Sequence, residues 1–430
     1  MIAKPVEDVV RCLWRTIGWI PIVVWLLVGY ILPDTSGAAF GVRSFVNSWD
    51  SHSHSFAFLC IASACFLIVW LLCFRWGKYG PHSAAVLWLL LIYVSPYFYL
   101  PLAKEYSYSS LAAGAAFVFS IAGALLSCYA AGSTERILKT FVLLCAVQAV
   151  YALVYFALGR NPWASHHVFR MAGTFDTPAT LYFLMLLCLP QALNMTFNSR
   201  QSAERTLWGF CSLVSFVTLC LTFSRTGIAA AILSVLWMLS RSGVSRKILV
   251  LVAAALLMPL IGIVGMRSGG GPARTTYDAS YRFMVWTQGT KLFLQHPLLG
   301  VGVGLVSLPV EEIKDGNWSE VLYRAPDNAY LLWLDERGVV GAVLFVFFVV
   351  FLRRRLASYR TSWHVSLAAS LLGLLIAGIG DAPYGRAYRE TETVAVVILI
   401  GATLMLPKEE RDGTKNAEEV PTELLPVPFL

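Results

Sequence analysis

Long apolar segments separated by short polar ones dominate this chain. About twelve segments approach the ~20 apolar residues that a helix needs to cross ~30 Å of hydrocarbon. They lie at 16–33, 56–74, 82–101, 108–131, 137–158, 178–197, 206–223, 226–240, 247–266, 338–352, 364–380 and 391–406. The seventh and eighth are divided at Ser224-Arg225, because an unbroken span would leave the arginine inside the membrane. The pattern predicts an all-α polytopic membrane protein with about twelve transmembrane helices.

The basic residues predict which side of the membrane each loop faces. Every second loop is basic, and by the positive-inside rule these loops, with both termini, are cytoplasmic. The set comprises Lys4, Arg11 and Arg15; Arg75 and Lys78; Arg136 and Lys139; Arg200 and Arg205; Arg241, Arg246 and Lys247; Arg353, Arg354, Arg355 and Arg360; and Lys408, Arg411 and Lys415. The net charge of +8 is therefore assigned to membrane orientation, and no nucleic-acid partner is expected.

One outer loop, between the ninth and tenth spans, is long enough to hold structure of its own. It divides the chain into spans at 1–266, the loop at 267–337, further spans at 338–406 and a disordered cytoplasmic tail at 407–430. After a glycine-rich break at 268–272, the loop is expected to form a helix over 278–295, ended by His296-Pro297. Glycines at 300, 302 and 304, a polar exposed tip at 311–320 and a short helix at 328–336, broken at Gly338, complete it.

Three arginines stand at the outer ends of apolar segments. They occur in Phe169-Arg170-Met171, in Phe223-Ser224-Arg225-Thr226 and in Tyr281-Arg282-Phe283. An arginine at the membrane edge either extends its charge into water or serves a function. Arg225 favours function, because it occupies a tight turn between two spans. Several arginines on one face indicate a site for an anion such as a lipid-linked phosphate.

Four segments of the chain resemble the O-antigen ligase and polymerase superfamily of bacterial envelope-glycan enzymes. They are Arg170-Met171-Ala172-Gly173-Thr174-Phe175-Asp176; Leu221-Thr222-Phe223-Ser224-Arg225-Thr226-Gly227; Tyr281-Arg282 through Trp286 to His296-Pro297-Leu298-Leu299-Gly300-Val301-Gly302; and Asp327-Asn328-Ala329-Tyr330-Leu331 with Glu336-Arg337-Gly338 and Gly341. Their order, spacing and shared outer side carry the resemblance.

The resemblance implies a membrane glycosyltransferase in the bacterial inner membrane, with its active site facing the periplasm. Such enzymes move a glycan from an undecaprenyl-diphosphate donor to a hydroxyl of another glycan or of the lipid A core, without a metal or other cofactor. The family often has His-Asn where this chain has Asp327-Asn328. This departure favours a polymerase or a divergent member of the superfamily over a ligase.

Transfer from a lipid diphosphate requires charge neutralisation and a base, and the sequence offers residues for both. Arg282 and Arg225 are the catalytic candidates for the departing diphosphate, and Asp327 is the candidate base for an inverting displacement. Neighbouring arginines would favour the ionised, weakly basic carboxylate. Asp327 has a second interpretation, as the cap of the helix that follows it. Candidate substrate-binding residues are Arg170, Asn328, Trp286, Tyr330, Arg386 and Arg389.

Several of these residues have an alternative structural role. Trp286 and Tyr330 could anchor the protein at the membrane interface instead of stacking on sugar rings. Arg386 and Arg389 share the last outer loop with Asp381 and Tyr384, where surface ion pairs would also account for them. The histidine pairs at 52/54 and 166/167 are interpreted as solvated loop residues, and no metal site is predicted.

Two other classes of protein fit the membrane topology. A transporter or flippase of lipid-linked or anionic solute is the alternative to an enzyme, but it should place charges near the middle of its spans. A structural scaffold would have no need of arginines at the span ends. The clustering of the candidate residues on one outer side favours the enzyme.

Overall fold

The computed structural model describes residues 133–406, apart from 160–161, 166–167, 174–177, 244, 246, 248–249, 251–252, 255–256, 259–260, 263–271, 302–305, 307, 315–317, 325, 358–361, 382–389 and 405. The expected spans at 16–33, 56–74, 82–101 and 108–131, much of 247–266, and the tail lie outside the described residues. Arg386 and Arg389 lie outside them as well.

The expected spans that fall in the described part are helical. They form α7 (Thr134–Ala157), α8 (Pro178–Asn198), α9 (Ser202–Leu221), α10 (Arg225–Arg241), α13 (Ala329–Ala357), α14 (Ser362–Gly380) and α15 (Glu390–Leu404). Within the described residues, α7, α8, α9 and α14 are long and apolar enough to cross a membrane. The prediction of an all-α membrane protein is confirmed at this level.

Helix α8 is the centre of the bundle. It contacts α7, α9, α10, α14 and α15, and its residues from Leu181 to Leu189 are all buried. A helix that is apolar on every side can lie in a protein core or face lipid, and the contacts of α8 place it in the core. The sequence of α8 is apolar on every side, because apolar residues occupy nearly every position over two and a half turns.

A buried polar contact joins α8 to α14 within this apolar bundle. The Gln191 amide donates to the Ser370 hydroxyl at 3.0 Å and accepts from the Ser366 hydroxyl at 2.8 Å. Ser370 in turn donates to the Leu187 carbonyl at 2.8 Å. Hydrocarbon offers polar groups no alternative partner, so these bonds fix the register of the two helices.

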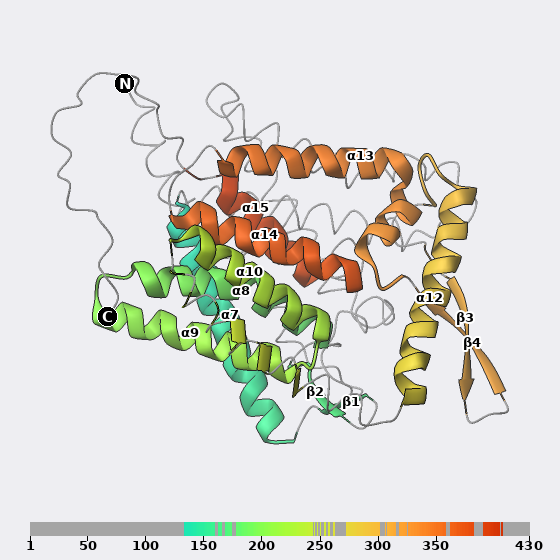
Figure 1. Ribbon diagram of the computed structural model, residues 1–430, viewed down its shortest axis with the longest axis horizontal. Coiled ribbons are helices and arrows are strands. Elements are labelled where there is room, and N and C mark those ends of the chain that lie inside the picture. Colours follow the sequence, from blue (N-terminus) through green and yellow to red (C-terminus); the bar gives the residue numbers. More distant parts are fainter. Residues whose placement is uncertain are drawn as a thin grey trace, which may run out of the picture.

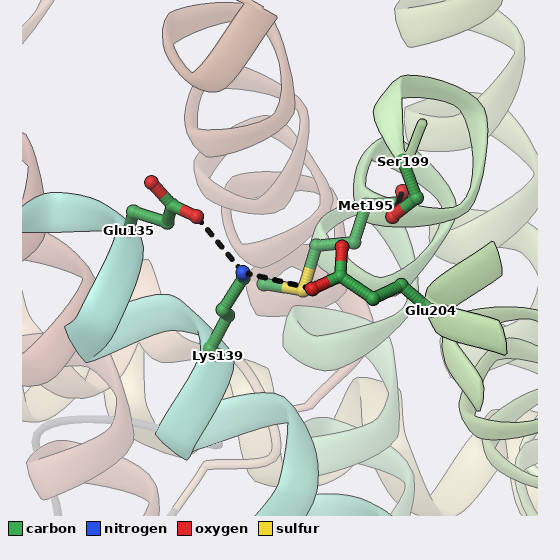
Figure 2. A network of polar contacts seen from close by, with 5 residues as sticks. All are labelled: Glu135, Lys139, Met195, Ser199 and Glu204. Atoms are coloured by element: carbon green, nitrogen blue, oxygen red, sulfur yellow. Dashed lines mark hydrogen bonds and ion pairs between the residues drawn. The ribbon is translucent and has the colours of Figure 1, made fainter. Parts of the chain in front are cut away.

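An ion pair joins α7 to α9 at one end of the bundle. The Lys139 ammonium lies 2.9 Å from Glu135, one turn earlier on α7, and 3.9 Å from Glu204 on α9 (Figure 2). All three side chains are partly exposed, so the contribution to stability is about 0–1 kcal/mol. The carboxyl ends of α10 and α13 are basic, with Arg241 on α10 and Arg353–Arg355 on α13. The candidate site lies at the opposite, amino-terminal ends of these two helices.

The long loop expected at 267–337 lies at the other end of the bundle (Figure 1). Its helix α12 (Pro272–Gln295) crosses the ends of the other helices and contacts α13. The expected helix began at 278, six residues later. Proline at the first helical position explains the earlier start, because this position needs no amide hydrogen.

Two β-hairpins accompany the helices, and neither is predicted from the sequence. β1 (Pro162–Ser165) pairs with β2 (Val168–Met171), and β3 (Leu308–Lys314) pairs with β4 (Trp318–Arg324), both antiparallel. The second hairpin occupies the stretch 311–320 that was expected only to form a polar tip. Charged residues obscure the alternation there, although Val310, Val321 and Tyr323 are residues that favour strands.

We expect Gln191→Leu to lower the free energy of unfolding by about 1–2 kcal/mol, because it removes both bonds to α14 and leaves Ser366 without its acceptor on α8. The measurement is thermal unfolding of the full-length protein in detergent. Ser240→Ala is the matched control, since its hydroxyl is exposed and bonds only within α10. Equal midpoints for the two variants would contradict a role for Gln191 in joining the helices.

Candidate functional site

The carboxyl end of α14 accepts hydrogen bonds from three candidate residues. Arg282 on α12 donates from Nη1 to the Gly380 carbonyl at 2.7 Å. Asn328 donates from Nδ2 to the Ile379 carbonyl at 3.0 Å, and the Tyr330 hydroxyl donates to the Leu375 carbonyl at 2.6 Å. The last carbonyls of a helix have no partner inside it and carry partial negative charge, which favours a cation such as Arg282.

Arg282 is partly buried and uses one N–H group for this bond. Among the described residues, this is the one hydrogen bond that its guanidinium makes. The remaining N–H groups are therefore available to a ligand, while the bond to Gly380 fixes the direction of the guanidinium. This arrangement suits an anion with several oxygen atoms.

Asn328 caps α13. The Asn328 side-chain oxygen accepts from the backbone N–H groups of Tyr330 and Leu331, both at 3.0 Å. The N–H of Ala329 donates to the Asp381 carbonyl at 3.1 Å. The first three amides of the helix are thus occupied, so this helix start is not an open anion site. Asp327 lies partly buried immediately before the cap.

The turn that holds Arg225 is formed as the sequence predicts. α9 ends at Leu221, Ser224 accepts from the Gly227 N–H at 3.1 Å as the cap of α10, and Arg225 is the first residue of that helix. Phe223 between them has a φ of 51°, in the left-handed region that residues other than glycine adopt at a cost of roughly 1–2 kcal/mol. Backbone strain of this kind is common at functional sites.

Arg170 lies on β2 and reaches the same turn. Its Nε donates to the Thr222 carbonyl at 2.9 Å, at the carboxyl end of α9. Only Phe223 and Ser224 separate Thr222 from Arg225, so the two arginines flank one short turn. Part of the Arg170 guanidinium is therefore committed to holding the turn in place.

Tyr182 and Asp381 connect this turn to α14. The Tyr182 hydroxyl donates to the Asp381 carboxylate at 3.0 Å, and a side chain at Gly227 would collide with the Tyr182 ring. Thr226 packs against Gly380, where a Cβ would lie 2.7 Å from the threonine hydroxyl. The structure thus brings the motifs around Arg225, Arg282 and Asn328 to one place. Tyr182 was missed in the sequence, where its only signal is a polar group near the start of an apolar span.

A second set of contacts locks the turn after α12 to the kink in α13. The N–H of Val301 donates to the Asp335 carbonyl, and those of Val339 and Val340 donate to Pro297 and Leu298, at 2.8–3.1 Å. Gly300 and Gly338 have φ angles of 69° and 59°, and a side chain on either would collide with the opposite backbone. The Gly300 N–H donates to the His296 carbonyl at 3.0 Å and so forms part of this turn.

The two aromatic candidates, Tyr330 and Trp286, differ in whether their side-chain donor already makes a hydrogen bond. The Tyr330 hydroxyl is occupied by Leu375, whereas the buried Trp286 indole N–H has no hydrogen-bond partner. The Trp286 ring meets Phe283 edge-on at 5.9 Å. No group of three potential metal ligands occurs among the residues that the structure describes. Trp286 is thus the aromatic candidate with a donor to offer.

Comparison with known families gives the same assignment as the motifs. Residues 210–346 match the family described as O-antigen ligase. This part of the chain is therefore similar to the O-antigen ligase family. The matched segment contains the turn at Arg225, all of α12 and the start of α13, and it confirms the resemblance to the O-antigen ligase and polymerase superfamily. The family supports a glycosyl-transferring membrane enzyme of the bacterial envelope. No curated protein matches the chain.

We expect Gly338→Ala to destabilise the protein by several kcal/mol, because it combines left-handed strain with a collision against the Leu298 backbone. Gly243→Ala is the matched control: Gly243 has a φ of 76° but open space around it, so only about 1–2 kcal/mol of strain is expected. Thermal unfolding in detergent compares the two. Similar losses would mean that the contact with Leu298 contributes nothing.

Proposed function

We propose that this protein transfers a glycan from an undecaprenyl-diphosphate donor to an acceptor hydroxyl on the periplasmic face of the bacterial inner membrane. The proposal rests above all on the joining of the Arg282, Asn328 and Arg225 segments at the end of α14. The basic ends of α10 and α13 lie at the opposite end of their helices. By the positive-inside rule, this supports a site that faces the periplasm and cytoplasmic termini.

In this mechanism the arginines bind the leaving diphosphate. The bond between the anomeric carbon and the diphosphate oxygen breaks, and the negative charge that develops on that oxygen is neutralised by Arg282 and Arg225. Arg282 is held at the Gly380 carbonyl with N–H groups to spare, which supports a fixed clamp. Arg170 positions the turn of Arg225 through Thr222 and contributes charge to the same region.

The acceptor hydroxyl attacks from the opposite face of the sugar, which inverts the anomeric configuration. Its proton passes to a carboxylate, and Asp327 is the candidate because it precedes the Asn328 cap that is bonded to α14. The neighbouring Pro326 packs against Gly289 of α12, so Asp327 sits beside the helix that carries Arg282. Trp286, with its unpaired indole N–H, is assigned to the glycan.

The described spans offer less support for a transporter. Among the described residues, one buried polar contact deep in the bundle, Gln191 with Ser366 and Ser370, is uncharged and internally satisfied. A pathway for an anionic solute would need charged or unpaired groups near the middle of the spans. The departure from His-Asn at Asp327-Asn328 supports a polymerase, in which the acceptor is another glycan, over a ligase to the lipid A core.

We expect Arg282→Ala to lower glycan transfer by about 10²–10³-fold, because it removes a fixed donor to the leaving group. Transfer is measured in membranes supplied with a polyprenyl-diphosphate oligosaccharide, read on a lipopolysaccharide gel and as released polymer. Arg353→Ala, an exposed arginine at the other end of α13, is the control and should retain wild-type transfer. Equal activity of both variants, with a change in which membrane face exposes lipid-linked units, would favour the transporter.

We expect Asp327→Asn to lower transfer by about 10²-fold or more while leaving the unfolding temperature within a degree or two of wild type. The helix cap is Asn328, so the substitution removes the base and not the cap. Transfer and thermal unfolding are measured on the same preparation. Near-normal turnover would rule out Asp327 as the base.

A further inference from the structure

Asp335 is a buried carboxyl group that the proposed mechanism does not use. Its side chain is 0% exposed, and neither carboxyl oxygen has a hydrogen-bond partner. It lies on the first part of α13, before the kink at Gly338 and outside the expected span. An ionised carboxylate without a partner is costly to bury, so the geometry favours the uncharged acid.

The carboxyl group of Asp335 packs against the backbone of α12. A Cβ added at Gly289 would lie 2.8 Å from the Asp335 Oδ2, 3.0 Å from Leu331 and 3.2 Å from Pro326. Gly289 follows Arg282 by seven residues, which is about two helical turns and therefore the same face of α12. One face of this helix thus contacts α14 through Arg282 and α13 through Gly289.

The charged groups on the surrounding elements do not compensate a negative charge at Asp335. Arg337 is paired with Glu336 and lies over the Trp333 ring at 4.5 Å. Burial, and then the charge of Glu336, raise the pKa of Asp335 to about 7. Among the residues whose side chains the structure describes, the other charged or titratable groups on the adjoining segments include Arg282 and Lys291 on α12, His296 in the turn after it, Asp327 before α13 and Asp381 after α14.

We propose that Asp335 is a positioning residue that acts as an uncharged acid: its neutral carboxyl allows α12 to pack on α13 and so holds Arg282 at the end of α14. Loss of the proton would place an unpaired charge in this contact and loosen it. α12 would then no longer present Arg282 in a fixed direction. The proposal depends on the proposed function only for its effect on transfer, because the packing effect can be measured separately.

The direction of the pH effect follows from the raised pKa. The folded state binds the Asp335 proton more tightly than the unfolded chain, whose aspartates titrate near about 4. The stabilising contribution is therefore complete below about pH 4 and is lost as the pH rises through about 7.

The experiment follows thermal unfolding of the full-length protein in detergent from about pH 5.5 to about pH 8.5. We expect the midpoint of the wild type to fall by several degrees over this range and that of Asp335→Asn, which is neutral at every pH, to fall much less. Glu204→Gln is the control, because it removes a partly exposed carboxylate at the other end of the bundle and should keep the wild-type slope.

Glycan transfer is measured on the same samples. We expect wild-type transfer to decrease by up to about tenfold per pH unit above pH 7, and Asp335→Asn to keep its transfer there. Equal pH slopes of unfolding for wild type and Asp335→Asn would overturn the proposal. So would an Asp335→Asn protein that is inactive and unstable at every pH while Asp335→Glu behaves as wild type. If the pH slopes of unfolding differ between wild type and Asp335→Asn but neither protein transfers glycan, the packing role of Asp335 is supported. Only the proposed function is then contradicted.

Discussion

The candidate site depends on one physical requirement, which is that the last carbonyls of α14 find hydrogen-bond donors. Ile379 and Gly380 end a helix at the edge of the apolar bundle, where their carbonyls have no partner inside the helix. Asn328 and Arg282 supply the donors from two segments far away in the sequence. The same bonds that satisfy α14 thus place an arginine and the start of α13 next to the turn of Arg225.

The outer loop is kept in register by backbone contacts, and not by side chains alone. Gly300 and Gly338 allow the turn after α12 and the kink of α13 to approach so closely that their amides and carbonyls pair. Because α12 is fastened there at its carboxyl end and by Arg282 nearer its middle, its direction is fixed at two points. A rigid α12 would matter for catalysis, since a clamp on a leaving group is effective only when it is already oriented.

The transmembrane helices provide the support for this arrangement. α8 is surrounded by other helices and carries Tyr182 near its amino-terminal end, where the hydroxyl holds Asp381 directly after α14. Deeper in the bundle, Gln191 fixes the register between α8 and α14. The position of the α14 carbonyls relative to the Arg225 turn is thus set by contacts within the apolar core.

The sequence by itself determined the features that depend on neighbouring residues. Hydropathy and charge gave the described spans, the division at Ser224-Arg225 and the break at Gly338, because each reflects the cost of a local charge or backbone angle. The sequence did not predict the two hairpins, the extra turns of α12 or the role of Tyr182. It also did not show that Asn328 is the cap of α13. Only the tertiary structure decided that α14 is the common acceptor and that Asp335 is buried. These facts depend on which distant groups meet, and local patterns carry no information about such pairings.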